Sequence, residues 1–188
     1  MIRKEMADIN RECFAPKSMH VDLLKHHPDV IPVLAEWIYE QWHTYDYSLT
    51  KDRLITSFSH RLNDDQIPLA FVVWKSDLLI GTLSVKHNHA SELADFPQNA
   101  AWIGSLQVIA EERNQGVGQG LITLAKKVGA ALGHKTLYLY TSNPLNVDWY
   151  LARGGRVLHK RLFRNHTITV IEISSAPPRR EEEKKIPF

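Results

Sequence analysis

The sequence contains a single cysteine, Cys13, among its 188 residues. One cysteine cannot close an intramolecular disulfide or supply the thiolate set of a metal cluster. No apolar stretch approaches the ~20 residues that a helix needs to span a bilayer. The first residues carry charges of both signs instead of the apolar run of a secretory signal. We therefore expect a cytoplasmic protein without a membrane partner and without a metal ion.

A strong excess of either charge is also missing. The 23 basic and 21 acidic residues leave a net charge of only +2, whereas proteins that neutralise phosphates normally carry a clear basic excess. Nucleic acid is therefore not the expected partner. A chain of this length fits one domain. We place that domain at residues 18–175, between a polar N-terminal extension (residues 1–17) and a C-terminal tail of prolines and charge blocks (residues 176–188).

Hydrophobic periodicity divides the central region into helices and strands. Apolar residues recur at three- and four-residue steps after Asp29, the expected N-cap of a helix that extends to residue 42. Further expected helices span 50–62, 121–132 and 145–153, and expected strands span 19–25, 69–74, 78–85, 101–109, 136–141, 156–163 and 167–173. These elements predict an α/β domain of the α+β type. Helices flank a mixed, largely antiparallel central sheet, and one strand–helix–strand crossover carries a glycine loop.

The glycine loop is the most informative segment. It lies between the strand at 101–109 and the next helix, and it contains Gly116, Gly118 and Gly120. Glycine lets the backbone approach a ligand without a Cβ in the way. The first amides of a helix have no internal partner, and the macrodipole adds partial positive charge there. The loop is therefore expected to cradle an anion, most naturally a phosphate.

Two common nucleotide motifs do not fit this loop. A dinucleotide fingerprint needs Gly-x-Gly-x-x-Gly, but the third glycine comes one residue early and Leu121 occupies its place. A P-loop needs Gly-Lys-Ser/Thr, which the sequence lacks. The glycines alone leave open a structural turn that binds no ligand.

Arg113, three residues before Gly116, completes the pattern Arg/Gln-x-x-Gly-x-Gly/Ala. Here the sequence resembles the pyrophosphate loop of the GNAT family of N-acetyltransferases. The resemblance extends over roughly residues 19–173. It implies the GNAT fold and acetyl-CoA as cosubstrate.

A second motif supports the resemblance. The family commonly shows Asn-x-x-Ala-x-x-Phe-Tyr-x-x-x-Gly-Phe after the crossover. Asn143, Trp149, Tyr150 and Gly154 fall in register with it. Asn146 replaces the usual alanine and Gly155 the usual phenylalanine, which puts the local packing in doubt more than the chemistry.

The resemblance also implies roles for individual residues. Tyr150 would protonate the departing thiolate, and Asn143 would hydrogen-bond to the cofactor arm, so these two are the expected catalytic residues. Without the resemblance, Tyr150 would be interpreted as a core tyrosine. The implied cofactor-binding residues are Leu106, Gln107, Val108, Arg113, Asn114, Gln115, Gly116, Val117, Gly118, Gln119 and Asn143.

The substrate side is less specific. Tyr45, Asp46 and Tyr47 follow an aromatic helix and could hold a cationic amine through ring faces and one carboxylate. Glu92 and Asp95 lie in the loop before the cofactor strand, where substrates of the family bind. A general base is needed because an amine with a pKa of about 10.4 is mostly protonated at neutral pH. The candidates are Glu92, Asp95, His87 and His89, and Ser105 or Gln107, whichever faces the cleft, could hold a relay water.

The resemblance thus implies an N-acetyltransferase that moves the acetyl group of acetyl-CoA to a primary amine by direct attack in a ternary complex. The acceptor is a small molecule or a peptide, and both a monomer and a homodimer are open. One alternative is a non-catalytic acyl-CoA-binding or sensing domain of the same fold. A nucleotide-binding interaction module is disfavoured by the failed fingerprints.

Overall fold

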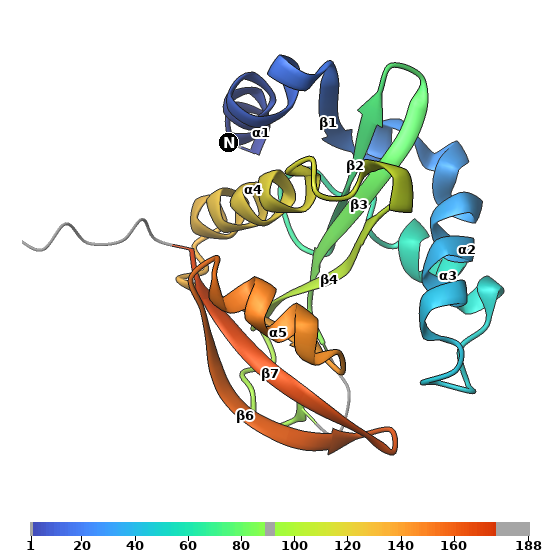
Figure 1. Cartoon of the computed structure of the whole chain (residues 1–188), viewed down its shortest axis with the longest axis vertical. Helices are drawn as coiled ribbons and strands as arrows, with labels where there is room; N and C mark the ends of the chain where they lie inside the picture. Colours follow the sequence, from blue (N-terminus) through green and yellow to red (C-terminus); the bar gives the residue numbers. More distant parts are fainter. Residues whose placement is uncertain (1, 89–92, 176–188) are drawn as a thin grey trace, which may run out of the picture.

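A seven-stranded sheet forms the centre of the protein, whose computed structural model describes residues 2–88 and 93–175 (Figure 1). The strands are β1 (Met19–Leu23), β2 (Leu69–Lys75), β3 (Leu78–Lys86), β4 (Ala101–Val108), β5 (Thr136–Thr141), β6 (Gly155–Phe163) and β7 (His166–Ser174). They lie in the order β1-β2-β3-β4-β5-β7-β6. Only the β4–β5 pair is parallel among these seven strands. The predicted fold class, a largely antiparallel sheet with one crossover, is confirmed.

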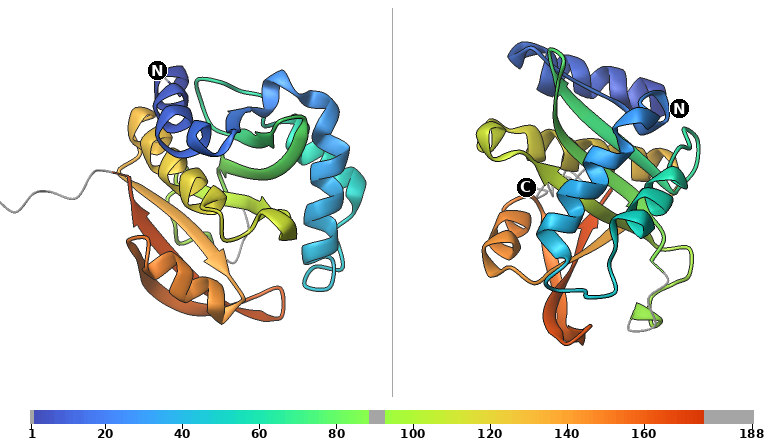
Figure 2. Two further views of the ribbon diagram at one scale, coloured as in Figure 1. Left: turned by 45° about the horizontal axis from the view of Figure 1, so that its top comes forward. Right: turned by 90° about the vertical axis from the view of Figure 1, so that its right-hand side faces the viewer.

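Helices cover both faces of the sheet. They are α1 (Ile2–Ile9), α2 (Ile31–Trp42), α3 (Lys51–Ser59), α4 (Val117–Ala131) and α5 (Pro144–Leu151), with short helical turns at Asn10–Phe14, Ala15–Lys17, Leu24–His26, Pro28–Val30 and Ala110–Glu112. α1, α4 and part of α5 share one apolar core with the sheet, and α2 and α3 form a second core with it (Figure 2). The apolar stripe predicted for residues 121–132 is the buried face of α4.

The parallel strands β4 and β5 separate soon after they meet. Their register contains only Ala101 with Leu137 and Trp102 with Tyr138. Beyond this point a gap opens in the sheet. On its other edge β4 has an irregular register with β3, between Thr82 and Ser84. Ser105 lies in this bulge with a φ of 51°, so the strand changes direction where the gap begins.

Residues 2–17, the segment expected to be a polar extension, contribute to the main core. The side chains of Ile2, Met6 and Ile9 are buried at i, i+4 and i+7 spacing, so one face of α1 packs on the domain. Phe14 reaches the first turn of α4, where Gly120 leaves room for its ring. A Cβ on Gly120 would lie 2.7 Å from Phe14 Cζ.

Two details of the N-terminal half concern helix starts. The expectation that Asp29 caps a helix is wrong: it lies in the 3-10 turn Pro28–Val30, which runs directly into α2. The N-cap of α2 is Val30, which makes no side-chain cap. Thr50 does cap α3, because its Oγ1 accepts a hydrogen bond of 3.2 Å from the amide of Arg53.

Phe14→Ala is expected to destabilise the whole domain, because the Phe14 side chain is only 1% exposed. Removal of a buried phenylalanine ring costs about 3–5 kcal/mol, which corresponds to a fall in melting temperature of roughly 10 °C for a chain of this size. Differential scanning calorimetry measures the effect. Leu78→Ala, at a side chain that is 54% exposed, is the control. Equal melting temperatures for the two variants would mean that residues 2–17 do not belong to the cooperative unit.

Candidate active site

A groove of about 600 Å³ begins where β4 meets α4. It is lined by backbone and side chains from the end of β4, the glycine loop and α5. Of the eleven predicted cofactor-binding residues, ten line it: Leu106, Gln107, Val108, Arg113, Asn114, Gly116, Val117, Gly118, Gln119 and Asn143. Gln115 does not line it, because its side-chain amide turns toward the carbonyl of Glu111.

The N-terminus of α4 opens into this groove. Gly116 is the N-cap, with a φ of 86° that favours glycine. The first helical hydrogen bond runs from Gly120 N to Gly116 O over 2.9 Å. The amides of Val117, Gly118 and Gln119 therefore precede the first partnered amide, and together with the helix dipole they can bind a diphosphate.

The arginine of the motif acts on the shape of the loop. Arg113 Nε donates a hydrogen bond of 3.0 Å to the carbonyl of Val108, the last residue of β4. This bond closes the turn between strand and helix. The rest of the guanidinium is exposed at the groove, where it can add positive charge toward an anion.

Gly120 does not belong to the anion cradle, contrary to the sequence-based expectation. It is buried, does not line the groove and faces the ring of Phe14. Only Gly116 and Gly118 leave backbone open to a ligand. Gly118 is also covered on one side, since a Cβ there would lie 3.2 Å from Trp149 Cζ2.

One further cation, Arg153, lines the groove, and another, Lys17, contacts the glycine loop. The sequence analysis did not single them out. The guanidinium of Arg153 stacks 3.7 Å from the ring centre of Trp149 and donates to its carbonyl over 2.7 Å. Lys17 hydrogen-bonds to the carbonyl of Gln115 in the loop. The four-residue spacing of Trp149 and Arg153 is a signal that could have been used, whereas the contact of Lys17 arises from tertiary packing.

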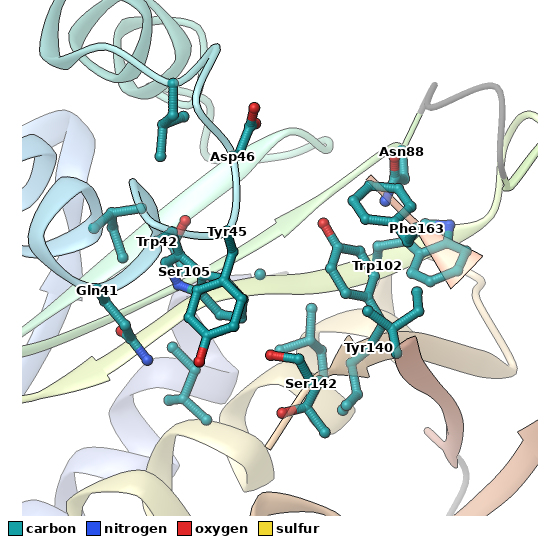
Figure 3. Close-up of a pocket in the computed structure, with 18 of the residues that line it drawn as sticks. Gln41, Trp42, Tyr45, Asp46, Asn88, Trp102, Ser105, Tyr140, Ser142 and Phe163 are labelled. Carbon is teal, nitrogen blue, oxygen red and sulfur yellow. The ribbon is translucent and has the colours of Figure 1, made fainter. Parts of the chain in front are cut away.

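A second cavity, of about 570 Å³, lies in the gap between β4 and β5 (Figure 3). Its walls come from α2 and the loop after it, α3, β3, β4, β5, α5 and the β6–β7 turn. The labelled rings of Trp42, Tyr45, Trp102, Tyr140 and Phe163 surround it. The cavity therefore offers apolar and aromatic contact area for an organic ligand.

The two cavities meet at the side chains of Gln41, Leu106, Asn146 and Tyr150, which line both of them. A ligand in the groove and a ligand in the second cavity would thus come together beside Tyr150. Burial raises the pKa of Tyr150 to about 12, so its phenol stays protonated at neutral pH. Its hydroxyl forms no hydrogen bond with any residue that the structure describes, and it is available to a ligand.

Asn143 has a structural role at the same place. It is the N-cap of α5, and its Oδ1 accepts a hydrogen bond of 3.0 Å from the amide of Leu145. The cap fixes the start of the helix that carries Tyr150. Because Asn143 also lines the groove, its amide nitrogen can still donate to a ligand.

Two cations of the second cavity, Arg61 and Lys86, have little exposure to solvent and no carboxylate partner among residues 2–88 and 93–175. Arg61 is 4% exposed and donates to the hydroxyls of Ser84 and Ser105 over 2.9 Å and of Ser57 over 2.7 Å. Burial lowers the pKa of Arg61 to about 10. Burial and the neighbouring Arg61 lower the pKa of Lys86 to about 8. Neither cation was found from the sequence.

Of the predicted substrate residues, Tyr45 and Asp46 line the second cavity. Asp46 forms an ion pair with Arg164, so its carboxylate is already engaged. Tyr47 is 92% exposed and lines neither cavity. Asp95 lines neither cavity and makes two 2.7 Å hydrogen bonds with Arg161.

Of the two residues that could hold a relay water, Ser105 lines the second cavity and Gln107 the groove. His87 lines neither, and its Nδ1 lies 3.2 Å from the carbonyl of Ala100. Glu92, His89 and the predicted C-terminal tail lie outside the described residues. Within these residues no helix could cross a membrane, and no cluster of His, Cys, Asp and Glu could hold a metal ion.

The N-terminus of α4 lies at a split parallel strand pair, and a second cavity lies behind the split. This arrangement fits an acyltransferase that binds an anionic cofactor at the helix N-terminus. The particular family follows from the sequence model of the acetyltransferase (GNAT) family, which matches residues 28–154. The chain belongs to this family, as the resemblance predicted.

Solved structures support the same assignment at the level of the fold. A chimeric spermidine N-acetyltransferase of Vibrio cholerae is 18% identical, with a TM-score of 0.60 over 85% of this chain and 96% of that one. An aminoglycoside 6'-N-acetyltransferase complexed with coenzyme A is 14% identical, with a TM-score of 0.63 over 84% and 97%. A GNAT acetyltransferase of Streptococcus pneumoniae is 13% identical, with a TM-score of 0.61 over 83% and 98%. No curated protein matches the chain in sequence.

Proposed function

We propose that the protein transfers the acetyl group of acetyl-CoA to a primary amine, with both substrates bound at once. The meeting of the two cavities at Leu106, Asn146 and Tyr150 carries this proposal. A cofactor in the groove places its reactive end at this junction, and an amine in the second cavity reaches the same point. Two neighbours in fold are named for amine substrates, spermidine and aminoglycosides.

The groove fits acetyl-CoA because it joins a diphosphate site to an open strand edge. The amides of Val117, Gly118 and Gln119 bind the diphosphate, with Arg113 and Arg153 as nearby cations. The edge of β4 beyond Trp102 has no pairing with β5, so its backbone groups can bind an extended amide-containing arm. The one carboxylate that lines the groove in the described residues, Glu112, is neutralised by Lys75 at 2.8 Å.

Bound there, acetyl-CoA supplies a thioester whose C–S bond breaks as the C–N bond to the amine forms. Tyr150 donates its phenolic proton to the departing sulfur. The nitrogen loses one proton to solvent as it becomes an amide, and Tyr150 takes one proton back from solvent. The attacking nitrogen must be neutral. The buried guanidinium of Arg61 disfavours a positive charge in the cavity and so lowers the pKa of a bound amine, which raises the neutral fraction of the amine.

An acetylated cysteine is not expected as an intermediate. Cys13, the sole thiol of the sequence, lines neither cavity. Direct transfer therefore predicts intersecting lines in two-substrate initial-rate plots, and incubation with acetyl-CoA alone leaves the mass of the protein unchanged. Parallel lines, or a stable acetyl adduct on the protein, would contradict direct transfer.

The function itself is tested by release of free thiol from acetyl-CoA with a panel of amines, together with a gain of one acetyl group in the amine by mass spectrometry. Thermal stability with acetyl-CoA, NAD and ATP establishes the cofactor independently of turnover. Stabilisation by acetyl-CoA without turnover of any amine would favour the alternative, a non-catalytic acyl-CoA-binding or sensing domain.

A further inference from the structure

The side chains that line the second cavity are mainly positively charged, whereas a polyamine or another polycation would need negatively charged ones. Its described lining contains four cationic side chains, Arg53, Arg61, Lys86 and Arg164, but a single carboxylate, Asp46. That carboxylate is paired with Arg164. A second ammonium or guanidinium on the acceptor would meet like charge rather than a carboxylate.

The charge of Lys86 has no visible structural role. Its ammonium group forms no hydrogen bond or ion pair with any residue in 2–88 or 93–175. The side chain lies over Gly104, where a Cβ would be 2.9 Å from Lys86 Cε. Glycine at this position therefore makes room for the lysine. A desolvated charge without a partner destabilises the fold, and such a group is a candidate for ligand binding.

Arg61 brings a second positive charge to the same wall of the cavity. Three serine hydroxyls hold its guanidinium, and none of them neutralises it. Its charge is one of the two causes of the low pKa of Lys86, so the two cations sense each other. An anion placed between them would relieve both their mutual repulsion and their lack of a counter-charge.

The position of these cations along β4 sets the size of the ligand. Lys86 lies against Gly104, Arg61 bonds to Ser105, and Leu106 lines both cavities. Two strand residues span at most about 7 Å. The cations thus contact the two residues of β4 that directly precede Leu106, at the junction where the amine must attack. This short separation along the strand favours a carboxylate close to the amine, as in an amine whose carboxylate is one carbon away.

We propose that the acceptor is an amine bearing a carboxylate, of the α-amino acid type, and that Lys86 binds this carboxylate with Arg61 beside it. The proposal rests on the acetyl transfer proposed above. The aromatic lining of the cavity surrounds the remainder of the substrate. The product is then an N-acetylamino acid.

Matched substrates test the carboxylate directly. Each L-amino acid is compared with its amide and with the amine that lacks the carboxyl group, for example L-phenylalanine, L-phenylalaninamide and 2-phenylethylamine. Spermidine is added as a polycation. At least one amino acid is expected to have a kcat/KM ten or more times that of its two partners. Turnover restricted to amides, plain amines or spermidine would contradict the proposed carboxylate site, but it would still support acetyl transfer to an amine.

Lys86→Met separates the carboxylate site from the rest of the machinery. It keeps an unbranched side chain as far as the ε position and removes the charged ammonium group. For the preferred amino acid kcat/KM is expected to fall at least tenfold, mainly through KM, while kcat/KM for its amide changes less than threefold. Lys135→Met, at an exposed lysine between α4 and β5, is the matched control and changes neither value.

The folded state of the Lys86→Met variant is checked by its melting temperature, which is expected to equal or exceed that of the wild type because an unpaired charge is removed. Equal losses for the acid and its amide would overturn the role of Lys86. Absence of turnover with every amine, in a protein that acetyl-CoA stabilises, instead overturns the transfer function.

Discussion

Gly118→Glu is expected to weaken the binding of acetyl-CoA at least 100-fold. Gly118 lies in the first turn of α4, between two other amides that face the groove, and its own lack of a side chain leaves the backbone accessible. The new carboxylate would stand where the diphosphate binds. Two like charges about 4 Å apart repel by roughly 4 kcal/mol near a protein surface, and a 100-fold loss corresponds to about 2.7 kcal/mol.

The substitution is not expected to unfold the protein. A glutamate in the first turn of a helix interacts favourably with the dipole, by about 0.3–1 kcal/mol, and glycine is a poor helix former. The contact that opposes these gains is the new Cβ, 3.2 Å from the ring of Trp149. The side chain of Trp149 lies at the groove, and a shift of a few tenths of an ångström relieves the contact.

Isothermal titration calorimetry with acetyl-CoA measures the effect, and the thermal shift at a fixed ligand concentration confirms it. Gln115→Glu adds the same charge to the same loop, at a side chain that does not line the groove, and is expected to lose less than tenfold. Gly118→Ala isolates the steric part. Wild-type affinity in Gly118→Glu would show that the cofactor binds elsewhere.

The parts of the fold that the sequence predicted depend on short-range patterns. The glycine loop and the helix after it could be predicted because Gly116, its arginine and the apolar stripe of α4 lie within one continuous segment. The two hairpins could be predicted because β-rich runs flank short polar turns. The crossover then fixed the parallel pair β4–β5.

The missed parts depend on contacts between distant segments. Ile2, Met6 and Ile9 have helical spacing, but charged residues between them gave the segment a polar average. Phe14 of this segment packs on α4 at Gly120. The sequence analysis therefore placed Gly120 in the ligand-binding loop, although the absence of a side chain there makes room for the Phe14 ring.

The acceptor cavity was predicted least well, for the same reason. The aromatic segment before Tyr47 indicated one wall, but the cations Arg61 and Lys86 come from the turn after α3 and from β3. No local motif joins these two residues. The ion pair between Asp46 and Arg164 likewise joins segments more than 100 residues apart, and it removes the carboxylate that the sequence suggested for a cationic amine.

Tyr150→Phe is expected to lower kcat by about 10²–10⁴, the usual contribution of a general acid. Because the Tyr150 hydroxyl has no hydrogen-bond partner among the described residues, its loss leaves packing against Trp149 intact, and the melting temperature and the affinity for acetyl-CoA should stay near wild-type values. Tyr45→Phe makes the same chemical change in the second cavity, away from the junction. It is expected to alter KM for the amine at most, with little effect on kcat.

The raised pKa of Tyr150 is consistent with this role. Since burial raises it to about 12, the proton needed by the departing sulfur is present throughout the range in which the protein is studied. An ordinary thiol has a pKa of about 8.5, and the same dry environment raises the pKa of a thiolate beside Tyr150, which reduces the mismatch between donor and acceptor. The protonated phenol of Tyr150 is the active form, and it is lost only as pH rises through about 12.

In the wild type, kcat at saturating substrates should therefore show no alkaline fall due to Tyr150 between pH 7 and 10. A wild-type kcat in Tyr150→Phe at neutral pH would contradict the role of Tyr150 as the acid. The ring would then only separate the two cavities, and solvent would protonate the sulfur.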